Sequence, residues 1–458
     1  MFKSLQLSQL VKPLNARLIG VDTEFSALSS DSRKVTSGQL FVALRGEFFD
    51  GHSYLADVAK RGAVAAVVEE ITADLAIPQL LVADTRIALG QIALLNRQQF
   101  SGKTVAVTGS SGKTTVKEML ASICRSALGA TAVLATRGNL NNELGVPFTL
   151  LELNAQHRAA VVELGASRLG EIAYTAALVQ PMVAVISNAG MAHAGEFGGP
   201  EQIILAKGEI LDGLAAEHTA VLNLDDGAFE QWRTRNTICQ VLSFSTSNPA
   251  ADVYASAISS NAQGRMGFNL HGVAGEGFIQ LAVLGLHNVS NALAATAAAH
   301  ALGLPLTAIK QGLESMSAIS GRSVVHACAN HVQLIDDSYN ANPASIRAAI
   351  DVLENMPGQR VLVLGDMGEL GTWAEQEHAQ IGAYANGKVD AVYAVGPLMQ
   401  HAIAQYCGVS GHFLEQNSLI EALLAQVSGP ATLLIKGSRS AAMENVVNAL
   451  RTGLGETL

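Results

Sequence analysis

The feature that most constrains the fold is the stretch TGSSGKTT at residues 108–115. It follows a short β-branched run at 103–107, typical of a buried parallel strand, and precedes a helical apolar pattern at 116–124. The two glycines let the backbone turn with its N–H groups pointing inward, and the helix start adds the positive end of its dipole. A strand, a glycine turn and a helix in this order are the context of a phosphate-binding loop.

The glycine spacing differs from that of a Walker A motif, because Val107 stands where the first glycine of that motif would fall. A glycine-rich turn with a chance lysine is therefore the alternative interpretation. The strand–turn–helix context and the Lys-Thr pair favour phosphate binding, with Lys113 reaching the terminal phosphates and the Thr114 hydroxyl available to Mg²⁺. The residues predicted to bind the nucleotide here are Gly109, Ser110, Ser111, Gly112, Lys113, Thr114 and Thr115.

Length and composition limit the possible classes of protein. A chain of 458 residues is too long for one hydrophobic core, and 49% hydrophobic with 15% charged residues indicates packed globular domains. The net charge of −10 argues against nucleic-acid binding. The four cysteines are scattered and form no CxxC pair, and the sequence shows no export signal and no apolar run of membrane-spanning length. These features predict a cytoplasmic protein without a membrane span.

The order of strand and helix patterns predicts an α/β fold in three domains. Residues 1–85 read as a small N-terminal α/β domain. Residues 86–318 read as a central phosphate-loop domain with a largely parallel sheet, carrying an antiparallel appendage at 220–280. Residues 319–458 read as a C-terminal Rossmann-like domain, although its loops lack the GxGxxG of a dinucleotide site.

Polar residues follow two predicted strands of the central sheet. One strand ends at Glu163, and the next runs through Asn188 towards His193. Because ligands of open α/β sheets bind outside the carboxyl ends of strands, these side chains and Lys113 are expected at one edge, where a carboxylate and an imidazole suit Mg²⁺. Taken singly, Glu163 also fits a capping residue and His193 an ordinary loop histidine.

Further polar residues stand out from their surroundings. Asn139 belongs to an asparagine-rich loop whose amides suit phosphates or a carboxylate. Asn288 and Asn291, at i and i+3 of a predicted helix start, suit the edge of a base, although one of them also fits a cap. Lys207, at the centre of a helix predicted over 200–214, reads from spacing alone as a solvated surface residue. In the N-terminal domain one polar cluster sets an arginine beside two hydroxyls that suit a phosphate, although on physical grounds an ordinary loop is the better explanation: Ser30, Asp31, Ser32 and Arg33.

These motifs together resemble the Mur ligases, ATP-dependent enzymes that build the peptide of bacterial cell-wall precursors. The resemblance covers all three domains and rests on TGSSGKT at 108–114, GNLNN at 138–142, Glu163, His193, AKGEI at 206–210, GLHNVSN at 285–291 and GR at 321–322. Within the family, DDSYNANP at 336–343, GDMGELG at 365–371 and KGSR at 436–439 look like the member that joins D-alanyl-D-alanine to a UDP-N-acetylmuramoyl-tripeptide. The shortened glycine spacing is the family's own.

The resemblance implies that a substrate carboxylate attacks the γ-phosphate of ATP and that the dipeptide amine then attacks the resulting acyl phosphate. It also implies two Mg²⁺ ions, one on Thr114 and Glu163 and the other on His193 and Lys207, with Lys207 as an N-carbamate. The catalytic set would be Lys113, Glu163, His193, Lys207 and Arg322.

The remaining contacts follow from the same resemblance. Asn288 and Asn291 would contact adenine, and Arg322 with Asp337 would contact the ribose and phosphates. Residues 30–33 and the loop through His52 would take the UDP end. The dipeptide would meet Asn340, Asn342 and Arg439. The partners are small molecules, and a monomer is expected.

One departure from the family pattern concerns the segment after His193, where the glutamate, Glu196, stands one place late, so that Glu196 receives no role. The alternatives are a tripeptide ligase, an enzyme like folylpolyglutamate synthetase, and a nucleotide-binding module without turnover. A simple phosphotransferase would leave the N-terminal domain and the asparagine and arginine positions unexplained.

Overall fold

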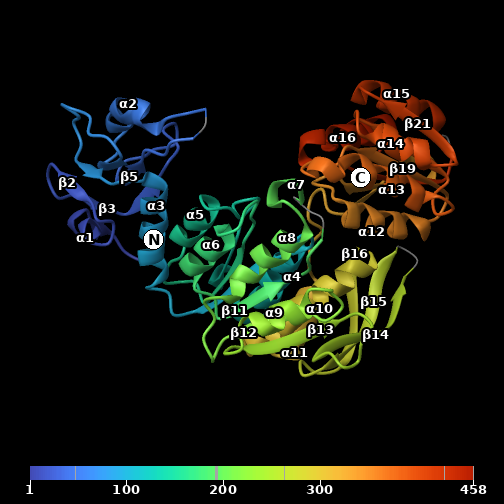
Figure 1. Ribbon diagram of the computed structural model, residues 1–458, viewed down its shortest axis with the longest axis horizontal. Helices are drawn as coiled ribbons and strands as arrows, with labels where there is room; N and C mark the ends of the chain where they lie inside the picture. The colour runs from blue at the N-terminus through green and yellow to red at the C-terminus, as the bar shows by residue number, and fades with distance from the viewer. Residues whose placement is uncertain (47, 191–193, 262–263, 428, 457–458) are drawn as a thin grey trace. The chain divides into compact units, whose positions relative to one another are not determined.

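The computed structural model describes residues 1–46, 48–190, 194–261, 264–427 and 429–456 (Figure 1). Its described residues form a mixed α/β fold with sheets of five, nine and six strands and a two-stranded ribbon, β1 (Leu5–Gln6) with β3 (Glu24–Phe25). The predicted α/β fold with a parallel central sheet is confirmed. Backbone contacts divide the chain into two compact units, residues 1–106, 128–166 and 170–182, and residues 107–127, 167–169 and 183–458.

The N-terminal sheet has the order β2 (Arg17–Ile19), β7 (Gln79–Leu81), β6 (Ala65–Val68), β5 (Gln39–Val42) and β4 (Ala27–Ser29). Strands β4 to β7 pair in parallel, and β2 pairs antiparallel with β7 at the edge. The short helix α2 (Leu55–Lys60) buries Leu55 and Val58 in one core with Phe41 and Val68 of the sheet. Strands and a helix in this segment agree with the predicted small α/β domain.

The middle sheet has the order β16, β15, β14, β13, β12, β11, β8, β10 and β9. Its strands are β8 (Lys103–Thr108), β9 (Val133–Ala135), β10 (Ala159–Glu163), β11 (Val183–Ile186), β12 (Thr219–Asn223), β13 (Gln240–Ser245), β14 (Val253–Ser260), β15 (Arg265–Gly272) and β16 (Gly277–Leu284). Helix α4 (Lys113–Leu128) follows β8 after the glycine turn, as the sequence predicted.

The antiparallel appendage is smaller than predicted. The segments at 221–224 and 240–244 belong to β12 and β13, which pair in parallel with their neighbours, and only β14, β15 and β16 pair antiparallel. The prediction failed for β12 and β13 because helix α9 (Phe229–Arg235) connects them, and a helical crossover returns the chain in the parallel direction.

The alanine-rich helix α10 (Leu286–Ala301) contacts strands β11 to β16 and is buried along most of its length. Small side chains such as Ala292, Ala295 and Ala299 let its backbone lie close to the sheet. This close packing fixes the start of α10, which carries Asn288 and Asn291.

The C-terminal sheet has the order β17 (Val324–Ala327), β18 (Val332–Asp337), β22 (Ala431–Lys436), β19 (Gln359–Gly365), β20 (Ala391–Val395) and β21 (Val409–Phe413). All its pairs are parallel except β17 with β18. One face packs against α12 (Pro343–Glu354), α13 (Ala374–Ala385) and α14 (Met399–Gln405), the other against α15 (Gln416–Gln426) and α16 (Glu444–Gly453). Helices on both faces make this domain Rossmann-like.

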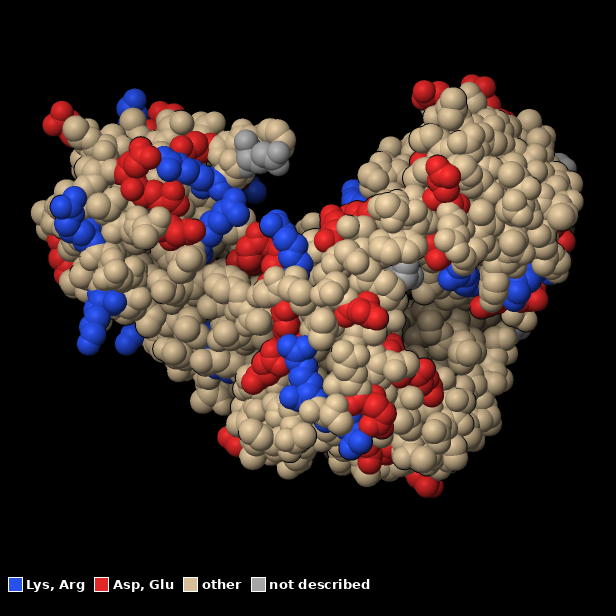
Figure 2. Space-filling view, in the orientation of Figure 1, with Lys and Arg blue, Asp and Glu red and all other residues tan. Residues whose placement is uncertain are grey.

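The surface carries charges of both signs. On the face shown in Figure 2, Lys and Arg side chains lie beside Asp and Glu side chains rather than in one extended basic area. Across the described part of the chain, no helix combines the length and apolar character that crossing a bilayer requires.

Candidate active site

The glycine turn between β8 and α4 has the backbone conformation that its sequence indicated. Gly109 and Gly112 have φ values of +147° and +80°, which side-chain-bearing residues rarely adopt. A Cβ on Gly112 would lie 2.3 Å from Asn291 Oδ1, and one on Gly109 would lie 2.0 Å from Ser187 Oγ. Both glycines are therefore required by conformation and by the close approach of neighbouring side chains.

Lys113 opens helix α4 and folds back over the turn. Its Nζ donates hydrogen bonds to the carbonyls of Gly109, at 2.7 Å, and Ser110, at 3.3 Å. A lysine charge and a helix N-terminus thus lie at one turn, which is the electrostatic arrangement that anionic phosphates need.

The end of β11 fixes the same turn from the adjacent strand. Asn188 accepts from Ser111 N–H through Oδ1 at 2.9 Å and donates through Nδ2 to the Ser111 carbonyl at 3.1 Å. Ser187 Oγ also donates to that carbonyl, at 2.6 Å. The sequence placed Asn188 at this edge but gave no indication that its amide pairs with the phosphate loop.

Two residues beyond position 320 contact the hydroxyls of the phosphate loop. Arg322 Nη2 donates to Thr114 Oγ1 at 3.0 Å, and its guanidinium lies 4.4 Å from the centre of the Tyr339 ring. Asn342 Nδ2 donates to Ser111 Oγ at 2.9 Å. Both side chains thus donate to the phosphate loop in this structure, while the contacts of Arg322 with ribose and phosphates and of Asn342 with the dipeptide stay predictions.

Asn288 and Asn291 are buried at the start of α10. Asn288 Nδ2 donates to the Leu284 carbonyl at 2.7 Å, and Asn291 Nδ2 donates to Asn288 Oδ1 at 2.9 Å. Neither side chain caps α10, since Gly285 occupies the cap position without a side-chain bond. The structure places Asn291 beside Gly112 of the phosphate loop, and the contact of both amides with a base stays a prediction.

Asp337 stabilises the turn that carries Arg322. Its Oδ1 accepts from Ser323 N–H at 3.0 Å, and its Oδ2 forms an ion pair with the buried Lys436 at 2.6 Å. Ser323 has a φ of +55°, so this turn needs such a partner. Asp337 is therefore engaged with neighbours in this structure, and its predicted contact with ribose stays a prediction.

Asn340 and Arg439 lie next to each other at the carboxyl ends of β18 and β22. Asn340 Oδ1 accepts from Arg439 N–H at 3.3 Å, and the Asn340 carbonyl accepts from Lys436 Nζ at 2.9 Å. The Arg439 guanidinium pairs with Glu444 at 2.8 Å and is largely exposed. The sequence did not predict that Lys436 links this pair to Asp337.

Glu163 ends β10 in a buried environment. Its Oε1 accepts from Asn141 Nδ2 at 2.8 Å, and its backbone N–H donates to Thr136 Oγ1 at 2.9 Å. Its Oε2 is buried without a hydrogen-bond partner among the described residues. Asn141 belongs to the same loop as Asn139, which is exposed. The cluster of asparagines in this loop was the sequence pattern that could have indicated Asn141 as a site residue.

Lys207 is buried rather than solvated, with 1% of its surface exposed. It belongs to α8 (Pro200–Gly208), which ends earlier than the predicted helix and continues as a short 3₁₀ turn at Glu209–Leu211. Its Nζ lies 5.0 Å from the centre of the Phe197 ring. A lysine is rarely this buried unless its side chain is paired. His193 lies outside the described residues, and no group of three His, Cys, Asp or Glu suited to a metal occurs within them.

The predicted UDP-binding residues lie in the N-terminal domain. Arg33 pairs with Asp31 at 2.9 Å, and the hydrogen bonds from Arg33 lower the pKa of Asp31 to about 2. Ser30 and Ser32, on either side of Asp31, are partly exposed. The Arg33 side chain is 84% exposed, so that it is accessible to an anion.

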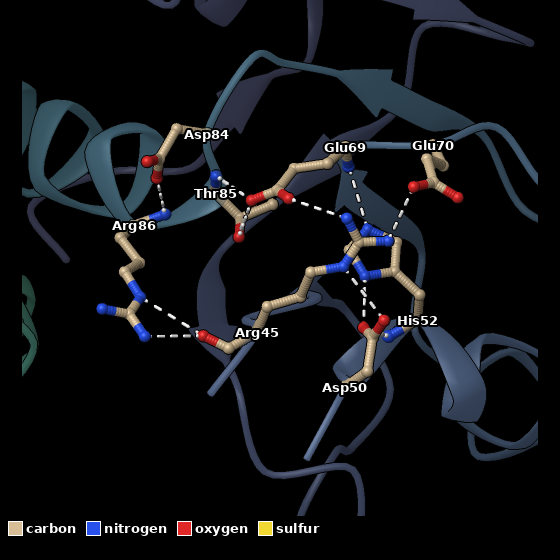
Figure 3. Close-up of polar contacts among 8 residues, drawn as sticks. All are labelled: Arg45, Asp50, His52, Glu69, Glu70, Asp84, Thr85 and Arg86. Carbon is tan, nitrogen blue, oxygen red and sulfur yellow. Dashed lines mark hydrogen bonds and ion pairs between the residues drawn. The ribbon is translucent and has the colours of Figure 1, made fainter. Parts of the chain in front are cut away.

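The loop through His52 is tied to its own domain by the contacts of Figure 3. The Arg45 guanidinium bonds Asp50, Glu69 and Glu70, at 3.0, 3.3 and 2.9 Å. His52 Nε2 accepts from Glu69 N–H at 2.9 Å, which requires the tautomer protonated on Nδ1, next to Asp50. Three carboxylates surround Arg45, a pairing that the loop sequence did not indicate.

The phosphate loop belongs to a parallel sheet. In chain order this sheet stands between a small α/β domain and a Rossmann-like domain. This combination defines the class of three-domain ATP-dependent ligases. The chain belongs to the Mur ligase family. It matches the family models for the Mur ligase family catalytic domain at residues 24–100, the Mur ligase middle domain at 107–299 and the Mur ligase glutamate ligase domain at 321–439.

Individual relatives cover nearly the whole chain. It is 44% identical over 451 residues to the UDP-N-acetylmuramoyl-tripeptide–D-alanyl-D-alanine ligase of Escherichia coli, covering 98% of each chain. Its fold matches a crystal structure of MurF from Acinetobacter baumannii with a TM-score of 0.93 at 40% identity, covering 98% and 99% of the two chains. A MurF ligase of Thermotoga maritima in complex with ADP matches with a TM-score of 0.85 at 27% identity, covering 93% and 97%.

Proposed function

We propose that this protein uses ATP to join D-alanyl-D-alanine to a UDP-N-acetylmuramoyl-tripeptide in the cytoplasm. The observation that carries the proposal is the phosphate loop, whose Ser111 and Thr114 hydroxyls accept hydrogen bonds from Asn342 and Arg322. The Arg322 contact brings a positive charge to the loop, where the proposed transfer of the terminal phosphate needs one. The specific substrates are those in the name of the Escherichia coli relative.

The reaction has two steps. A carboxylate oxygen of the tripeptide bonds to the γ-phosphorus of ATP and the bond to the ADP oxygen breaks, which gives an acyl phosphate. The dipeptide amine then bonds to the acyl carbon, phosphate leaves and the amine loses a proton. Lys113 and Arg322 supply positive charge where two anions must meet, and the loop N–H groups orient the phosphates.

We propose Thr114 and Glu163 as ligands of one Mg²⁺ ion, and His193 and Lys207 as ligands of a second. The unpartnered, buried Oε2 of Glu163 supports this assignment, because a buried carboxylate oxygen needs a hydrogen bond or a cation. When bound, Mg²⁺ neutralises phosphate charge.

A lysine carbamate explains why a lysine stands among these proposed ligands. The neutral Nζ bonds to the carbon of CO₂ and loses a proton, which converts a cation into an anionic oxygen donor. The near-complete burial of Lys207 supports the proposal, because a lysine this buried is rare unless its side chain is held by a partner, and a bound cation would be such a partner for a carbamate.

The two substrate ends are assigned to the flanking domains, with boundaries near residues 85 and 318. We propose residues 30–33 and the loop through His52 for the UDP end, where the exposed Arg33 guanidinium suits a diphosphate. Asn340 and Arg439 are proposed for the dipeptide, because a guanidinium at the carboxyl edge of a sheet suits a terminal carboxylate.

The test is phosphate release from ATP and Mg²⁺ with each acceptor supplied alone and together. The proposal requires release only when the UDP-tripeptide and D-alanyl-D-alanine are both present, with one amide formed per phosphate. Release with a single amino acid in place of the dipeptide would indicate a tripeptide ligase or an enzyme like folylpolyglutamate synthetase. Nucleotide binding without release would indicate a binding module.

A further inference from the structure

Strand β12 is followed by two adjacent carboxylates that bond different segments. Asp225 Oδ2 accepts from the backbone N–H and the hydroxyl of Thr246, at 2.8 and 2.9 Å. Asp226 Oδ2 accepts from Ala189 N–H at 2.8 Å, and its Oδ1 accepts from Ala228 N–H at 2.9 Å. The two residues are chemically identical, but only Asp226 bonds the segment that follows β11.

Asn223, the last residue of β12, bonds the same segment. Its side chain is buried, and its Nδ2 donates to the Ser187 carbonyl at 3.2 Å while its Oδ1 accepts from Asp225 N–H at 3.0 Å. Residues 187–190 are therefore bonded to the end of β12 at two backbone groups, Ser187 C=O and Ala189 N–H.

Ala189 lies between two residues that contact the phosphate loop. The Asn188 carbonyl accepts from Ser110 N–H at 3.0 Å, and the Gly190 carbonyl accepts from Ser110 Oγ at 3.0 Å. The Asn188 side chain pairs with the backbone of Ser111, as described above. A shift of Ala189 would therefore move both neighbours and the loop N–H groups that they orient.

We propose that Asp226 and Asn223 are positioning residues of the nucleotide site. They act through residues 187–190, which fix the Ser110–Ser111 backbone in the geometry that phosphate oxygens require. A carboxylate that accepts from a backbone N–H forms a charge-assisted bond, which is stronger and shorter than a neutral one. The inference rests on the proposed function, in which this loop binds ATP.

The test compares Asp226→Asn with Asp225→Asn in the full-length protein. Asp226→Asn keeps the size of the side chain but removes its charge. Its NH₂ group then faces a backbone N–H, so that two donors meet and one hydrogen bond is lost. We expect the Kd for ADP, measured by calorimetry, and the KM for ATP to rise about tenfold, the size of one charge-assisted hydrogen bond, while kcat changes less. Asp225→Asn removes an equivalent interaction on the same strand end, so its Kd for ADP should stay within about twofold of the wild type.

Equal Kd values for ADP in the two variants, whatever their melting temperatures, would overturn the positioning role. If Asp226→Asn does not fold, Asn223→Ser replaces it, because this change removes the amide that donates to the Ser187 carbonyl and leaves a shorter polar side chain. We expect a rise of about threefold in its Kd for ADP, and an unchanged Kd would overturn the role as well. A wild-type protein that binds no ADP would instead overturn the proposed function, and this inference with it.

Discussion

The guanidinium of Arg322 donates a hydrogen bond to the hydroxyl of Thr114 at 3.0 Å, although 208 residues separate them in the chain. The same guanidinium lies over the Tyr339 ring, at 4.4 Å from its centre. Thr114 follows the lysine of the phosphate loop, so the contact places a permanent positive charge next to the predicted terminal phosphate. The turn at Arg322 is itself fixed by Asp337 and the buried Lys436.

Arg322→Lys is expected to lower kcat/KM for ATP about 100-fold with little change in melting temperature. A lysine keeps the charge but loses the planar donor that both bonds Thr114 and stacks on Tyr339. Steady-state phosphate release measures the effect. Arg360→Lys is the matched control, because Arg360 pairs with Asp390 at 2.6 Å and contacts none of the proposed site, so its activity should be unchanged. Equal activity of the two variants would contradict the role of Arg322.

Asn342→Asp should separate helix capping from the contact with the phosphate loop. Asn342 Oδ1 accepts from Ser345 N–H at the start of α12, and an aspartate caps equally well. The aspartate loses the donor to Ser111 and adds negative charge near the phosphates, so we expect the KM for ATP to rise about tenfold at a nearly unchanged melting temperature. Asn342→Ala should also lower the free energy of unfolding by about 1 kcal/mol.

A double-mutant cycle with Ser111→Ala tests that contact directly. If the Asn342–Ser111 hydrogen bond contributes to ATP binding, the two substitutions should be non-additive by about 1 kcal/mol in the free energy derived from kcat/KM. Strict additivity would show that Asn342 acts elsewhere, for instance on the dipeptide.

Gly112→Ala is expected to abolish ADP binding, because its φ of +80° strains any side chain and the new Cβ would lie 2.3 Å from Asn291 Oδ1. Gly129→Ala isolates the conformational strain, since Gly129 has a φ of +97° and no atom within 4 Å of its Cβ position. Gly129→Ala should lose about 1–3 kcal/mol of stability from backbone strain, and Gly112→Ala should lose more because its Cβ also meets Asn291. Calorimetric titration with ADP should detect no binding to the first and normal binding to the second; binding to both would contradict the close-approach argument.

Lys207→Ala should abolish activity, and a short carboxylic acid should restore part of it by replacing the carboxylate of the proposed carbamate. Phosphate release with and without added acetate measures the rescue. Wild-type activity in Lys207→Ala would rule out a ligand role for this side chain. A rescue that occurs equally with neutral acetamide would argue against the carbamate.

Asp31 should titrate near pH 2 in the folded protein, because hydrogen bonds from Arg33 lower its pKa from 3.8 to about 2. A lowered carboxyl pKa means that the Asp31–Arg33 pair stabilises the fold above about pH 4 and that this contribution is lost as the pH falls towards 2. Arg33→Ala should return the pKa towards 3.8, the ordinary value. Carbon NMR titration of the Asp31 carboxyl measures both values, and identical titration in the two proteins would contradict the pairing.

Local sequence patterns were enough to predict the phosphate loop and the direction of most strands. Positive φ at Gly109 and Gly112, the strand before them and the helix after them all depend on residues close in sequence, so periodicity and glycine placement indicate them. The parallel direction of β12 and β13 was missed because a short alternating segment fits either direction, and the crossover helix α9 decides between them.

The sequence by itself determined the family, the phosphate loop and the residues at the carboxyl ends of the strands, because these are local features. Only the tertiary structure decided that Asn342 contacts Ser111, that Lys207 is buried and that Asp226, not Asp225, bonds the segment behind the phosphate loop. The physical reason is that a hydrogen bond between distant residues depends on distances of a few tenths of an ångström, which the packing of whole helices and sheets sets and no local pattern encodes.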